Sequence, residues 1–98
     1  MNNDIRNALL DLFSVCLEVN GAGRYHAHMS YAGHVDCVTV YVLPADTDYQ
    51  AKDYEHSFWH DVYVDEQDFR PSTLIVSNIA ELAGKVSEFL LPAQEEAA

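Results

Sequence analysis

The fold of this chain is decided by residues 24–43, which read RYHAHMSYAGHVDCVTVYVL. Apolar and polar residues alternate through 24–31 and again through 35–43, and this period of two predicts β-strands. Ala32 and Gly33 lie between the two runs, and a glycine there permits the positive φ of a tight turn. The sequence therefore predicts an antiparallel β-hairpin.

A two-residue turn sets the register of this hairpin. This register places Tyr25, Ala27, Val38 and Val40 on a face that packs against a core. His26, His28, Cys37 and Thr39 lie on the opposite face. A shift of one residue exchanges the two faces, so the register also decides which face is exposed. The predicted pairs are Tyr31 with His34, Ala27 with Val38, Tyr25 with Val40, His28 with Cys37, and His26 with Thr39.

The hairpin follows one amphipathic helix and precedes another strand. Residues 4–19 carry apolar side chains at helical spacing, with Asn3 as the N-cap and Asn20-Gly21 as the end. Pro44 ends the second strand, and an acidic loop follows to about residue 56. A third strand is predicted over about 57–65. The apolar stripe of the helix comprises Ile5, Ala8, Leu9, Leu12, Phe13, Cys16 and Leu17.

A second amphipathic helix is predicted near the end of the chain. Asn78 and Glu81 have the spacing of a capping box, and Leu91-Pro92 would stop the helix. Residues 73–76, Thr-Leu-Ile-Val, are predicted as a short fourth edge strand or an extended lead-in. The stripe of this helix comprises Ile79, Leu82, Val86, Phe89 and Leu90.

These elements predict an α+β two-layer sandwich in α-β-β-β-α order. A three-stranded antiparallel meander would carry both helices on one face. We expect residues 1–92 to form a single domain and residues 93–98 a short acidic tail. The double-stranded-RNA-binding domain has the same element order, but its basic helix start and cationic loops have no counterpart here.

Charge excludes several classes of partner. Five Lys and Arg residues stand against sixteen Asp and Glu, and the formal net charge is −11. So few cations cannot neutralise a phosphate backbone or hold an anionic membrane, so we expect neither nucleic acid nor membrane as a partner.

The first residues lack a signal-peptide pattern, and Cys16 and Cys37 are too few for a disulfide framework. A cytoplasmic location with reduced thiols is therefore the expectation.

Carboxylates and aromatic residues concentrate in the same part of the chain. Half of the sixteen carboxylates lie within residues 46–68. Carboxylates attract a basic partner over long range, and aromatic side chains supply anchors at the contact. The leading hypothesis is a small acidic inhibitor or binding module that occludes a basic, nucleic-acid-handling surface of another protein. Phage and mobile-element inhibitors of nuclease complexes, and immunity proteins of nuclease toxins, have a similar composition. The predicted contact residues are Asp46, Asp48, Asp53, Glu55, Asp65, Glu66, Asp68, Tyr41, Trp59 and Tyr63.

Two alternatives follow from the sheet face that the helices leave open. An uncovered face carrying Trp59 and tyrosines could be the seam of an accessory homodimer. Alternatively, His26 and His28 share one strand face and, with Cys37 across the hairpin, could form a zinc site. Cys37, His28 and Asp61 are also a nucleophile, base and orienter by residue type. No catalytic motif supports that combination, so we expect no enzyme and no cofactor.

Overall fold

The computed structural model describes residues 1–51 and 55–91 and confirms the α+β fold. The predicted tail, residues 93–98, and the candidate contact residue Asp53 lie outside the described residues. Among the described residues, the sheet has three antiparallel strands in the order β1-β2-β3. The elements are α1 Asn3–Ala22, β1 Tyr25–Ala32, β2 Cys37–Pro44, β3 Phe58–Tyr63, α2 Ser72–Ser87 and the short 3₁₀ helix η1 Glu88–Leu90.

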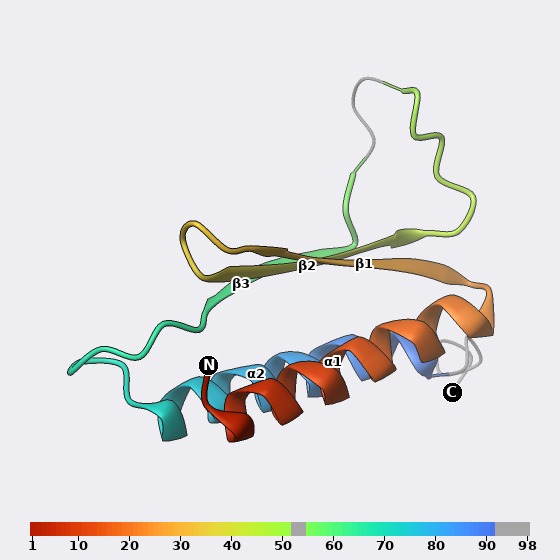
Figure 1. Ribbon diagram of the computed structural model, residues 1–98. Coiled ribbons are helices and arrows are strands. Elements are labelled where there is room, and N and C mark those ends of the chain that lie inside the picture. Colours follow the sequence, from red (N-terminus) through yellow and green to blue (C-terminus); the bar gives the residue numbers. More distant parts are fainter. Residues whose placement is uncertain (52–54, 92–98) are drawn as a thin grey trace.

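Both helices cover the same face of the sheet, as predicted, and they run side by side in the same direction (Figure 1). The core lies between the two layers. Val38, Val40 and Val42 of the central strand point into it and are fully buried. α1 and α2 contribute one apolar stripe each. The buried residues of these stripes are Ile5, Ala8, Leu12, Cys16 and Val19 in α1, and Ile75, Ile79, Leu82 and Val86 in α2.

The helix α1 begins and ends differently from the prediction. Its N-cap is Asn2, whose side-chain oxygen accepts a hydrogen bond from the Asp4 N–H at 2.6 Å. Its left-handed C-terminal residue is Gly23, with φ +85°, so the predicted end at Asn20-Gly21 was wrong. The prediction also placed Phe13 and Leu17 on the core stripe, but these side chains are 48 % and 56 % exposed.

The helix α2 begins six residues before the predicted cap at Asn78. Residues 73–76 are helical, so the predicted strand or lead-in there was wrong. The β-branched composition of this segment favours a strand locally, but Ile75 lies four residues before Ile79 and extends the same buried stripe. Burial on the core therefore outweighs local propensity. Pro71 occupies the N-cap position, and its fixed φ suits a helix start.

Replacing Asn78 distinguishes the two positions for this helix start. Inside a helix, Asn78→Ala should raise the free energy of unfolding by a few tenths of a kcal/mol, because alanine has the higher helix propensity. At an N-cap, the same change would lower it by about 1 kcal/mol. Chemical denaturation of both proteins measures the difference. A loss of about 1 kcal/mol would contradict the observed helix start.

The hairpin register differs from the prediction by four positions. The turn has four residues, 33–36, and its left-handed residue is Asp36 with φ +49°, not Gly33. Ala27 therefore pairs with Val42 and not with Val38. Residues 34–36 were predicted as part of the second strand and its first pair, but they belong to the turn. Because the displacement is even, the side chains of β1 and β2 stay on their predicted faces. The predicted pairing was wrong, whereas the assignment of residues to faces was right.

Candidate partner-binding surface

The open face of the sheet carries a row of rings across all three strands. His28 pairs with Tyr41, and Tyr41 pairs with Trp59. The His28 and Tyr41 rings stack, with centroids 4.5 Å apart and planes at 9°. Trp59 is 55 % exposed. This row presents apolar, flat surface to solvent on the side away from the helices.

A polar row lies beside the ring row. Thr39 donates its hydroxyl to Asp61 Oδ1 at 2.6 Å across the β2–β3 pair. Asp61 lies two residues from Trp59 and two from Tyr63 on β3, so all three side chains share one face. Tyr63 is 49 % exposed. A carboxylate thus lies between two exposed aromatic rings, each about 7 Å away along the strand.

The segment after β2 contributes a wall at one end of this face. Residues 45–51 rise from the sheet on the side opposite the helices (Figure 1). Tyr49 of this segment places its hydroxyl 3.1 Å from His28 Nε2 and 3.4 Å from His26 Nδ1. His56 contacts the Tyr41 ring edge to face, with centroids 5.0 Å apart. Two tyrosines and three histidines therefore join this wall to the sheet.

Tyr49 and His56 belong to this surface although the sequence pattern did not predict them there. Both belong to the segment between β2 and β3, where no periodic pattern predicts a neighbour. Tyr41 was correctly placed on the open face with His26 and His28. Only the packing of the wall on the strands brings the remaining two rings to them.

The histidine cluster makes stability depend on pH. Burial lowers the pKa of His28, and the nearby His26 and His56 lower it further by charge repulsion. The unfolded chain therefore binds a proton at His28 before the folded chain does as pH falls. His28 contributes stability above the unfolded pKa of about 6.5, and this contribution is lost as pH falls through the lower folded pKa.

We expect the free energy of unfolding to decrease between about pH 7 and pH 5, and to decrease less in His28→Gln. The glutamine keeps a hydrogen-bonding group toward Tyr49 but does not titrate. His34→Gln is the control, because His34 lies exposed in the β1–β2 turn, away from the cluster. Urea denaturation at each pH measures the slope. An unchanged slope in His28→Gln would contradict this role.

The candidate carboxylates divide into two groups at opposite ends of the sheet. Asp46, Asp48 and Glu55 are exposed in the segment that joins β2 to β3. The other group lies in the connection from β3 to α2, beyond the opposite end of β3 (Figure 1). The members of that second group are Asp65, Glu66 and Asp68.

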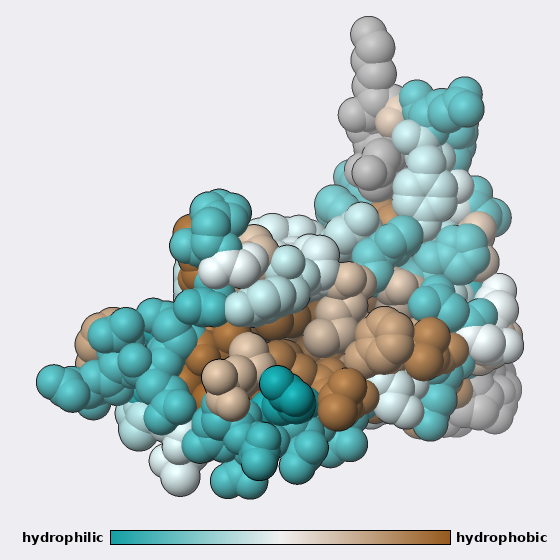
Figure 2. Space-filling model, viewed as in Figure 1, coloured by the Kyte–Doolittle hydropathy of each residue, from teal (hydrophilic) through white to brown (hydrophobic). Residues whose placement is uncertain are grey.

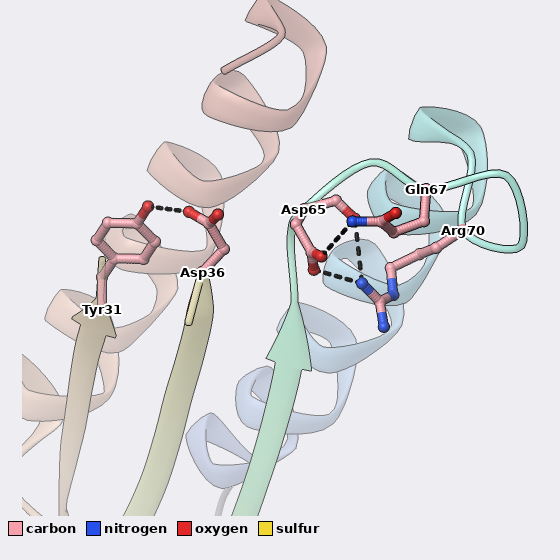
Figure 3. Close-up of polar contacts among 5 residues, drawn as sticks. All are labelled: Tyr31, Asp36, Asp65, Gln67 and Arg70. Carbon is pink, nitrogen blue, oxygen red and sulfur yellow. Dashed lines mark hydrogen bonds and ion pairs between the residues drawn. The ribbon is translucent and has the colours of Figure 1, made fainter. Parts of the chain in front are cut away.

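Asp65 already has partners within the chain. Arg70 forms an ion pair with its carboxylate, and Gln67 donates a hydrogen bond to it at 3.0 Å (Figure 3). The hydrogen bond from Gln67 is the main cause that holds the pKa of Asp65 below its ordinary value, and Arg70 also lowers it. The Arg70 guanidinium also lies 5.3 Å from the centre of the Tyr63 ring and 5.0 Å from that of Phe69. The chain itself thus holds an arginine between a carboxylate and aromatic rings.

The residues of the zinc alternative, His26, His28 and Cys37, do not lie together in the structure. Cys37 pairs with Ala32, four residues along β1 from His28, which is about 13 Å. Within residues 1–51 and 55–91, no three His, Cys, Asp or Glu side chains gather as a metal site would require. The same register keeps His28 too far from Cys37 to act as a base for a Cys37 nucleophile. Burial raises the pKa of the Cys37 thiol, and Asp61 adds to this effect.

Comparisons with protein families, with curated proteins and with solved structures found no match. In the part of the chain that the structure describes, neither helix has the length and apolar character needed to cross a membrane. The structure therefore defines the protein by its architecture, an α+β sandwich with one sheet face open.

Proposed function

We propose that this protein is a small acidic binding module that docks its open sheet face onto a basic surface of a partner protein. Trp59 and Tyr41 form the apolar floor of the site, and Asp61 supplies a carboxylate between the rings. The exposed Asp46, Asp48 and Glu55 attract the partner. Nucleic-acid-handling proteins have the basic surfaces that such a module would occlude.

The observation that carries this proposal is the exposed Trp59 beside Asp61 on the sheet face opposite α1 and α2. A guanidinium stacks favourably on indole, and a carboxylate next to the ring adds a charge-assisted hydrogen bond. The chain's own Arg70 is held by the same combination at Asp65 and Tyr63. This internal example favours arginine over lysine as the partner's contact residue, since lysine lacks the planar group that stacks.

A defined probe tests the site before any partner is identified. Trp59 is the only tryptophan, so its fluorescence reports events at the proposed floor. We expect an oligoarginine peptide to change this fluorescence at low salt and to bind more tightly than an oligolysine of equal length. Calorimetry supplies a readout that does not depend on tryptophan. Trp59→Ala should weaken oligoarginine binding at least fivefold in that assay.

Charge variants with equal net charge separate a site from general attraction. Asp46→Asn, Asp48→Asn and Glu55→Gln together should weaken oligoarginine binding about tenfold, because each lost ion pair contributes a few tenths of a kcal/mol. Asp48→Asn keeps the oxygen that accepts the Gln50 N–H. The matched control neutralises three exposed carboxylates outside the predicted contact residues, namely Asp11→Asn, Glu18→Gln and Glu88→Gln. Equal weakening by the two triple variants would refute the proposed site.

A further inference from the structure

The outer edge of β1 is partly closed by a side chain from α1. β1 is an edge strand, and its other side pairs with β2. Asn20 donates its amide to the Ala27 carbonyl at 3.0 Å and accepts the Ala27 N–H at 2.9 Å. The backbone groups of Ala27 therefore point away from β2. Val42, which pairs with Ala27, supports this orientation. Its carbonyl points away from β1 and accepts a hydrogen bond from the Ser57 N–H on the β3 side.

The same alternation leaves part of the edge open. In an antiparallel pair, every second residue directs its N–H and C=O outward. Met29 and Tyr31 follow Ala27 in this alternation, and no described residue bonds their outward groups. Residues 29–31 therefore form a short strand edge that can accept another strand.

An apolar stripe of α1 lies next to this open edge. Leu10, Phe13 and Leu17 are spaced by three or four residues and are 58 %, 48 % and 56 % exposed. With Met29 and Tyr31, the first two line a groove of about 310 Å³. Figure 2 shows hydrophobic residues gathered where α1 and β1 lie side by side.

This surface carries less negative charge than the rest of the chain, and its nearest carboxylate is Asp36, which accepts the Tyr31 hydroxyl at 2.6 Å at one end of the edge (Figure 3). The carboxylates of α1, Asp4, Asp11 and Glu18, repeat every seven residues and form a separate stripe. Asp4 and Asp11 line the groove toward α2, on the other side of α1. Among the described residues that line the apolar groove, Arg6 is the one with a charged side chain. Two copies with a net charge of −11 can therefore meet here with little local repulsion.

We propose that a second copy of this chain docks on this surface, which pairs the two β1 edges in antiparallel fashion about a two-fold axis. With the axis at Ser30, Met29 faces Tyr31 of the partner subunit. The outward N–H and C=O groups of Met29 and Tyr31 in one copy then form hydrogen bonds with those of the other copy. The two sheets become one six-stranded sheet, and the Leu10, Phe13 and Leu17 stripes meet beneath it. The N–H and C=O of Ala27 are already hydrogen-bonded to the Asn20 side chain, so they need no new partner in this register.

The amount of apolar surface supports a dimer of ordinary size. Four side chains that are about half exposed, Leu10, Phe13, Leu17 and Tyr31, leave on the order of 400 Å² of accessible area per copy. A stable interface needs about 800 Å² per partner. These four side chains therefore supply about half of that area, and in the proposed dimer the rest would come from the strand backbones and the flanking side chains. This dimer leaves the open sheet face free, so it is independent of the proposed partner binding.

Sedimentation equilibrium of the full chain tests the dimer. We expect a dimer at about 100 μM. Its dissociation constant should fall as salt rises from about 0.05 M to about 0.5 M, because salt screens repulsion between acidic copies. Phe13→Asp should weaken the dimer at least tenfold. The matched control Leu74→Asp, at an exposed position on α2, should leave it unchanged.

Proline variants test the strand pairing itself. Met29→Pro removes an outward N–H and should yield a folded monomer, because proline is tolerated where an edge N–H faces solvent. Met29 also packs against the core, so Met29→Ala, which keeps the N–H, is the matched control and should retain more of the dimer. Circular dichroism verifies the fold of each variant. A wild-type monomer at 100 μM would overturn the proposal and leave the edge to a chain of another kind. A dimer lost in Trp59→Ala but kept in Phe13→Asp would also overturn it, since the open sheet face would then be the seam.

Discussion

Leu12→Ala should lower the free energy of unfolding by about 3 kcal/mol and the melting temperature by roughly 15 °C. Leu12 is fully buried between the helix layer and the sheet. Its truncation removes apolar contacts and leaves a cavity that rigid neighbours fill only in part. Because domains of this size are stable by about 5–15 kcal/mol, this one change removes a large share of the stability.

Leu10→Ala is the matched control for Leu12→Ala. Leu10 lies two residues away on the same helix and is 58 % exposed. At dilutions where the chain is monomeric, it should change the free energy of unfolding by less than about 0.5 kcal/mol. At high concentration it should weaken the proposed dimer. Equal losses of monomer stability in the two variants would contradict the observed face of α1.

Asn20→Ala should lower the free energy of unfolding by about 1.5 kcal/mol. The change removes two hydrogen bonds to the Ala27 backbone, each worth about 1 kcal/mol, and alanine returns part of this through its helix propensity. The loss also frees another stretch of strand edge, so the variant should associate or aggregate more readily. Urea denaturation and light scattering measure the two effects.

Asn7→Ala is the control for Asn20→Ala. Asn7 is an exposed residue of the same helix, and its replacement should raise stability slightly through helix propensity. If Asn20→Ala were as stable as Asn7→Ala, the bond to the edge of β1 would have no energetic role. Asn20→Asp gives an intermediate case, because it keeps the acceptor for the Ala27 N–H and loses the donor.

Local pattern predicts most of the architecture of this chain. The alternation in 24–43 predicted two strands and the correct face for the side chains of β1 and β2, and helical spacing predicted both helices. Face assignment survived a wrong register because the turn is longer by an even number of residues. The loop length depends on Asp36 in a left-handed conformation, which an alternating pattern does not encode.

The candidate surface was predictable only in part. The period of two in β3 predicted that Trp59, Asp61 and Tyr63 share the open face of the sheet. Tyr49 and His56 reach that face only because the segment between β2 and β3 packs against it. The cluster of acidic residues in the sequence divides in space, because β3 separates its two parts.

The sequence by itself thus determined the order of the helices and strands, the core face of the sheet strands, most of the core stripe of each helix and the acidic character of the surface. These are local properties, set by the period of apolar residues and by composition. Tertiary structure alone decided the hairpin register, the bond from Asn20 to Ala27, and the exposure of Leu10, Phe13 and Leu17 beside an open strand edge. Each of these depends on how elements distant in sequence pack, and the free energy of that packing belongs to the whole assembly and not to any single segment.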